Sequence, residues 1–213
     1  KDTKRLFLIA LAFFITIRIK LPAQQNGGDD NASYSFKLAL DLFQKEKYAA
    51  AREKFEMVAE SISDPQSLLR ADAEYYAAVS AMELKHPDAT NMLTSFVDHH
   101  PEHAKIHMAN FYLGKSYYER RRYKAGAEAF DQVRIKELSE RQQDEFYFMA
   151  GYCWFTEDEY QKSKNSFAQL KDKETRFKPY AVYYFAHISY LEKDYEAALE
   201  HFEQIKNHKS FKP

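Results

Sequence analysis

The feature that most constrains the fold of this chain is an interval of twelve residues between two small side chains, which occurs five times. In every copy a phenylalanine or a leucine follows the second small residue by four positions. The five copies are Ala39, Ala51 and Phe55; Ala77, Ala89 and Leu93; Gly114, Gly126 and Phe130; Gly151, Ser163 and Phe167; and Ala186, Ala198 and Phe202. Successive copies begin 38, 37, 37 and 35 residues apart. Because the interval stays fixed while the period drifts, the interval must lie inside one rigid unit, and the drift must lie in the connections.

A helical hairpin is the unit that explains this spacing. The first small residue lets a partner helix approach closely, and the second faces it from that partner. The large side chain one helical turn later fills the space beyond. In four units a tyrosine marks the end of the predicted turn, three residues before the second small residue: Tyr48, Tyr123, Tyr160 and Tyr195. The sequence therefore predicts an all-α chain, with glycines placed where two helices touch.

These units resemble the tetratricopeptide repeat, whose pattern is W-x2-L-G-x2-Y, then A-x3-F and a final P. Unit three matches best, with Asn110, Leu113, Gly114 and Tyr117 at the first four positions. No unit has tryptophan at the first position, and three units replace the glycine by alanine. The resemblance implies a right-handed superhelical solenoid of about five hairpins, in which the first helix of each unit lines a concave inner wall. We expect an array over residues 33–210, with units near 33–64, 67–101, 104–138, 142–174 and 179–208.

The two ends of the chain differ from the repeats. Residues 1–23 combine a basic start with an apolar run over 6–17 and end in Ala23, which is the pattern of a secretory signal peptide. We expect cleavage after Ala23 and an exported protein, periplasmic or associated with the cell envelope; an uncleaved segment would instead anchor the chain in the inner membrane. Residues 24–32 indicate a flexible polar lead. Residues 211–213 repeat the Phe-Lys-Pro of 177–179, which predicts the start of a further unit and an N-terminal fragment of a longer array.

Charge and cysteine content limit the chemistry. The 31 lysines and arginines are balanced by 32 acidic residues, so the chain lacks the positive field that recruits nucleic acid. The single cysteine, Cys153, excludes an internal disulfide and a multi-cysteine metal site. No nucleophile elbow or phosphate-binding glycine loop is present in the sequence. We expect a non-enzymatic protein without a cofactor, which binds other proteins or peptide segments and no nucleic acid, and contacts membrane only through an uncleaved N-terminal segment.

Large aromatic side chains on the exposed side of the first helices form a candidate partner-binding groove. The candidates are Phe36, Phe43, Phe111, Tyr112, Tyr118, Phe148, Tyr152, Phe155, Tyr183, Tyr184, His187 and Tyr190. Two interpretations stay open, because large aromatic rings suit both a groove for a partner segment and tight packing between repeats. The leading function is a scaffold for protein–protein interaction in the bacterial cell envelope.

A histidine cluster supports an alternative function. Four of the eight histidines lie within residues 99–107, and His103 and His107 are one helical turn apart. That spacing, with His99 nearby, could hold a metal such as zinc. The alternative is therefore an envelope protein that handles a metal or a substrate, and the competing interpretation is a solvated turn between repeats.

Overall fold

The computed structural model describes residues 26–209, so the expected signal peptide and the expected further unit at 211–213 lie outside the described residues. Within residues 26–209 the chain forms ten α-helices, one 3-10 helix and no strand. The helices are α1 (Asn26–Gln44), α2 (Tyr48–Ser61), α3 (Leu68–Glu83), α4 (Ala89–His99), α5 (Ile106–Glu119), α6 (Tyr123–Phe130), η1 (Ile135–Glu137), α7 (Glu140–Thr156), α8 (Tyr160–Ala168), α9 (Lys178–Leu191) and α10 (Tyr195–Ile205).

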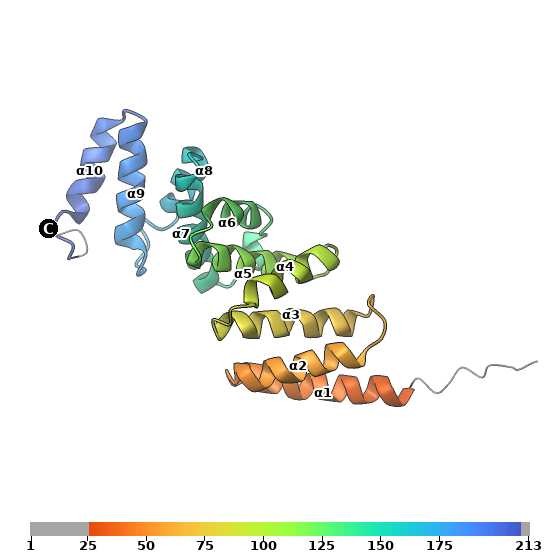
Figure 1. Ribbon diagram of the computed structural model, residues 1–213. Helices are drawn as coiled ribbons and strands as arrows, with labels where there is room; N and C mark the ends of the chain where they lie inside the picture. Colours follow the sequence, from red (N-terminus) through yellow and green to blue (C-terminus); the bar gives the residue numbers. More distant parts are fainter. Residues whose placement is uncertain (1–25, 210–213) are drawn as a thin grey trace, which may run out of the picture.

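The α-helices pair into five hairpins, one in each predicted unit. We call the odd-numbered helices A and the even-numbered helices B. Each of the first four B helices packs against the A helix of its own unit and against the A helix of the next. The stack curves, so that α1, α2 and α3 run across the view of Figure 1 while α9 and α10 stand upright at the opposite end. The predicted all-α solenoid is confirmed.

Helix α1 begins earlier than expected. It starts at Asn26, so residues 26–32, predicted to be a flexible lead, are helical. The partner helix explains the difference, because α2 extends to Ser61 and Ala32 is buried beside it. Packing of this kind stabilises a helix more than local propensity does.

The small residues lie where the two helices of a hairpin touch. A Cβ added at Gly114 would lie 2.7 Å from Cδ1 of Phe130, and one added at Gly151 would lie 3.1 Å from Cζ of Phe167. Ser163 uses its position differently, because its hydroxyl donates a hydrogen bond to the Gly151 carbonyl over 2.8 Å. The twelve-residue interval therefore marks the contact between helices A and B, as predicted.

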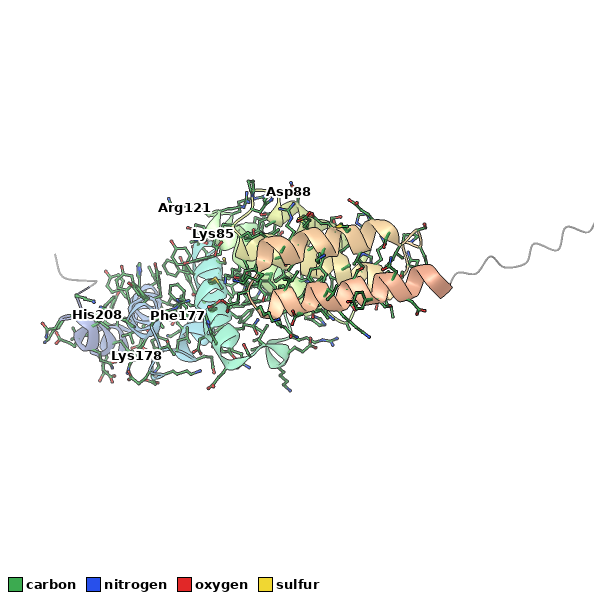
Figure 2. The ribbon with its side chains drawn as sticks, turned by 90° about the horizontal axis from the view of Figure 1, so that it is seen from below. Lys85, Asp88, Arg121, Phe177, Lys178 and His208 are labelled. Atoms are coloured by element: carbon green, nitrogen blue, oxygen red, sulfur yellow. The ribbon has the colours of Figure 1, made fainter. Side chains whose placement is uncertain are left out.

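All five turns inside the hairpins share one backbone conformation. A non-glycine residue with φ between 53° and 67° follows each A helix: Glu46, Lys85, Arg121, Asp158 and Lys193. In unit three the Arg121 amide donates to the Tyr118 carbonyl and the Arg122 amide donates to the Tyr117 carbonyl, each over 2.9 Å. This is the Schellman arrangement, in which the residue with positive φ is usually glycine. Lys85 and Arg121 lie along one edge of the array in Figure 2.

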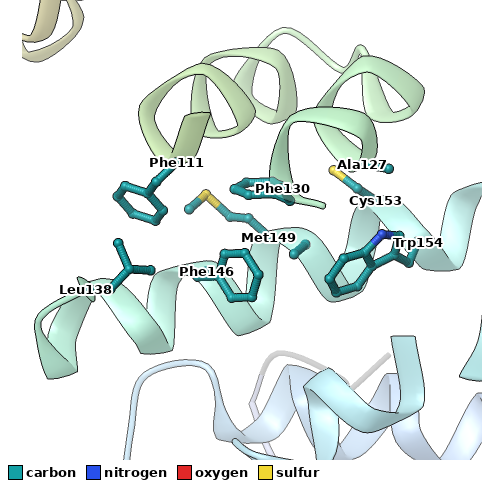
Figure 3. Close-up of a cluster of buried hydrophobic side chains, with 9 residues drawn as sticks. Phe111, Ala127, Phe130, Leu138, Phe146, Met149, Cys153 and Trp154 are labelled. Carbon is teal, nitrogen blue, oxygen red and sulfur yellow. The ribbon is translucent and has the colours of Figure 1, made fainter. Parts of the chain in front are cut away.

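The large residue that ends each repeat pattern closes the core of its hairpin. Phe55, Phe130 and Phe167 are fully buried. Phe202 is only partly buried, since α10 is the last described helix and nothing described packs beyond it. Figure 3 shows Phe130 between α5 and α7, with Leu138 also closing this core.

Candidate partner-binding surface

The A helices present a shared surface, which we call the inner face. On α5, Lys115 and Tyr118 are three residues apart and lie on one side of the helix. On α7, Glu145, Phe148 and Tyr152 follow at steps of three and four. The two sets meet: Lys115 Nζ donates to Glu145 Oε2 over 3.2 Å, and the rings of Tyr118 and Tyr152 have centroids 5.7 Å apart.

Aromatic contacts continue along the inner face from α7 to α9. The ring of Tyr184 lies 5.4 Å from that of Tyr152 and 5.2 Å from that of Phe155. Phe155 also contacts His187, and Tyr183 contacts Tyr184. Each of these side chains is partly exposed. The rings therefore join neighbouring repeats and keep part of their surface exposed.

Two candidates from unit one contribute chiefly to packing. Phe36 and Phe43 both contact Phe55 of α2 and Tyr76 of α3, with centroids 5.2 to 6.4 Å apart. Phe43 also contacts Tyr48 across the turn. These two rings lie at the junction of units one and two and are partly exposed.

Phe111 and Tyr190 differ widely in exposure. Phe111 is 1% exposed and belongs to the core, because α7 and the preceding Leu138 cover its side of α5. Its ring lies in the wall of the pocket described below but exposes almost no surface to a partner. Tyr190 is 55% exposed and contacts Tyr195 across the last turn. Tyr112 is partly buried, and Phe148 stacks on Phe177 with centroids 4.8 Å apart.

Burial extends the pH range over which the inner tyrosines are protonated. It raises the pKa of Tyr118 to about 12, with the neighbouring Tyr152 and Tyr123 adding to the effect. Burial and then Glu83 raise the pKa of Tyr112 to about 12, and burial raises that of Tyr184 above its usual range. At neutral pH these hydroxyls are neutral and able to donate hydrogen bonds to a partner.

A polar pocket of about 460 Å³ opens beside these aromatic side chains. Four units contribute to its wall, which consists of Glu46, Tyr48, Glu83, Phe111, Tyr112, Lys115, Ser139, Arg141, Gln142 and Glu145. Glu145 is 8% exposed and pairs with Lys115, Arg141 and Arg176 over 3.2 to 3.6 Å. The pocket thus joins charged groups that are far apart in the sequence.

The sequence did not predict this pocket. Its residues lie in different repeats and share no motif, and they meet only because successive hairpins turn relative to one another. The sequence singled out three of its lining residues: the turn tyrosine Tyr48 and the groove candidates Phe111 and Tyr112.

The structure separates the candidate metal ligands. His99 Nδ1 donates to the Ser95 carbonyl over 2.8 Å, and His107 Nδ1 donates to the Gln132 carbonyl over 2.7 Å. His103 lies 3.7 Å from Asp72 of α3, and burial lowers its pKa although Asp72 opposes the shift. Within residues 26–209, no group of three or more His, Cys, Asp or Glu side chains is placed to hold a metal ion.

Curved stacks of helical hairpins with an extended inner surface define the tetratricopeptide-type solenoid, a fold that serves as a scaffold for protein–protein interaction. No family model matches the sequence, and no curated relative matches it.

Solved structures share the fold. MamA of AMB-1 is 15% identical with a TM-score of 0.65, over 87% of this chain and 95% of that one. A putative kinesin light chain with TPR-like repeats from Podospora anserina is 14% identical with a TM-score of 0.54, over 84% and 97%. PilF of Pseudomonas aeruginosa is 18% identical with a TM-score of 0.53, over 83% and 76%. At these identities the likenesses establish the fold alone.

Proposed function

We propose that this protein is a non-enzymatic scaffold that binds a segment of another protein along the inner face of its array. The observation that carries the proposal is the polar pocket on the inner face, together with the partly exposed aromatic side chains that contact one another over α5, α7 and α9. Partner interfaces are enriched in tyrosine and other large rings. An inner face of this composition offers both apolar area and directed polar groups.

We further propose that the protein acts in the bacterial cell envelope. This part rests on the sequence of residues 1–23, whose basic start and apolar run of 6–17 are typical of a secretory signal. Within residues 26–209, every helix is too short or too polar to span a membrane.

Site-specific photocrosslinking tests the scaffold function. A photoreactive phenylalanine analogue replaces Tyr118, a partly exposed ring of the inner face on α5, or Glu128, an exposed residue of helix B in unit three. Each variant is irradiated in cells, and its adducts are identified by mass spectrometry. We expect one or a few discrete partner proteins joined at position 118 and absent at position 128. Identical adducts at both positions, or none at position 118, would contradict binding on the inner face.

A further inference from the structure

The inner pocket has an acidic end and a basic end. Its acidic end is formed by Glu46, in the turn after α1, and Glu83, the last residue of α3. Its basic end lies by the start of α7, where Lys115 and Arg141 face Glu145. The two ends differ in how far their charges are already neutralised.

The basic end is internally paired. Glu145 is nearly buried, and its Oε2 accepts a hydrogen bond from Lys115 over 3.2 Å. Arg141 and Arg176 lie 3.6 and 3.3 Å from its Oε1. A buried carboxylate with such partners holds them in place, since breaking the set would leave its charge uncompensated. Lys115, which is mostly buried, is therefore committed to the protein's own structure, whereas Arg141 and Arg176 stay largely exposed beside Glu145.

The acidic end lacks such partners. Among residues 26–209, neither Glu46 nor Glu83 forms an ion pair, and both are exposed. Their negative charges raise the pKa of Tyr48, after the larger effect of burial, and Glu83 also acts on Tyr112. Glu83 shares the pocket wall with two tyrosine rings, Tyr48 of unit one and Tyr112 of unit three.

Carboxylates beside aromatic rings are a combination that attracts a cation. The carboxylates accept charge-assisted hydrogen bonds from an ammonium or guanidinium group, and the ring faces add a cation–π contribution. We propose that the acidic end of this pocket receives the lysine or arginine side chain of a basic peptide segment in the partner protein. This proposal rests on the proposed scaffold function and names the chemistry of the segment that the inner face binds.

The position of the pocket gives the segment a direction. Tyr118 follows Lys115 by one turn on the same side of α5, and its ring leads on to Tyr152 of α7. A segment seated with its basic residue between Glu46 and Glu83 would therefore extend over the inner tyrosines. Apolar residues on one side of the basic residue fit that path.

Binding of defined peptides tests the proposal. The probe is a fluorescent decapeptide that combines three lysines with phenylalanine and serine, and its counterparts carry glutamate or norleucine in place of lysine. Anisotropy titrations compare the wild-type protein with the double variant Glu46→Gln/Glu83→Gln. The control double variant Glu60→Gln/Glu128→Gln removes the same net charge from exposed positions on B helices. Circular dichroism checks that all three proteins are equally helical.

We expect the lysine peptide to bind the wild type and the control equally, and to bind Glu46→Gln/Glu83→Gln about tenfold or more weakly. An equal loss of affinity in both double variants would show that net charge alone attracts the peptide, and it would overturn the proposal. Tighter binding of the glutamate or norleucine peptide, or no binding of the lysine peptide, would also overturn it. If photocrosslinks still form at position 118 in that case, the scaffold function stands and only the basic-segment proposal fails.

Discussion

The ring of Phe130 presses on the backbone of Gly114, so closely that a methyl group on Gly114 would lie 2.7 Å from the ring. The two residues come from the two helices of one hairpin, and they fix how closely α5 and α6 approach. The same relationship recurs between Gly151 and Phe167 at a slightly longer distance.

Replacing Gly114 by alanine should therefore lower the stability of the fold by about 1–3 kcal/mol, because the added methyl group overpacks the contact. Combining it with Phe130→Leu should cost less than the sum of the two single changes, since the smaller side chain makes room. Chemical denaturation of the two single variants and the double variant measures the coupling. Strict additivity would show that the two residues do not meet.

The turn residue Arg121 offers the opposite case, a glycine that the sequence lacks. Its φ of 58° is strained for a residue with a side chain, so Arg121→Gly should raise the stability by roughly 0.5–1 kcal/mol. Lys54→Gly is the matched control, because it removes the same charge from an exposed position in the interior of α2 and should destabilise by a similar amount. Melting temperatures shifted in the same direction by both changes would be inconsistent with this turn geometry.

Alkaline pH should weaken the fold through Tyr112. Burial raises its pKa from 10 to about 12, so the neutral form is favoured in the folded chain. The stabilisation is fully present below pH 10 and is lost as pH rises from 10 towards 12. Thermal melts over this range should show a shallower decline for Tyr112→Phe than for the wild type. If the melting temperature of the variant declines with pH as steeply as that of the wild type, other groups cause the alkaline sensitivity.

Export can be measured directly. Expressed with residues 1–23 in a bacterium with an outer membrane, the mature chain should begin at Gln24. N-terminal sequencing of the periplasmic fraction checks the cleavage site. A chain retained in the membrane fraction with residues 6–17 intact would favour the anchored alternative.

Local spacing was enough to predict the hairpins, because Gly114, Gly126 and Phe130 meet within one unit and their contact depends on a short stretch of chain. It was not enough to predict the pocket, where Glu46 and Glu145 come together through the angles between successive units. The start of α1 was missed for a related reason, since packing of Ala32 on α2 overrides the polar character of residues 26–32. Phe111 was expected to be exposed and is buried, because sequence spacing alone does not show how far α7 covers α5.

The central claim is that the partner binds the inner face and not the outer surface. Tyr190 on α9 and Leu199 on α10 are suited to test it, because they are 55% and 65% exposed and lie on helices A and B of the same unit. With the partner identified by crosslinking, calorimetry gives the dissociation constant for each alanine variant. We predict that Tyr190→Ala weakens binding by about 2 kcal/mol, as an interface hot spot does, and that Leu199→Ala leaves it unchanged. Equal affinities for the two variants, or a loss confined to Leu199→Ala, would contradict the account.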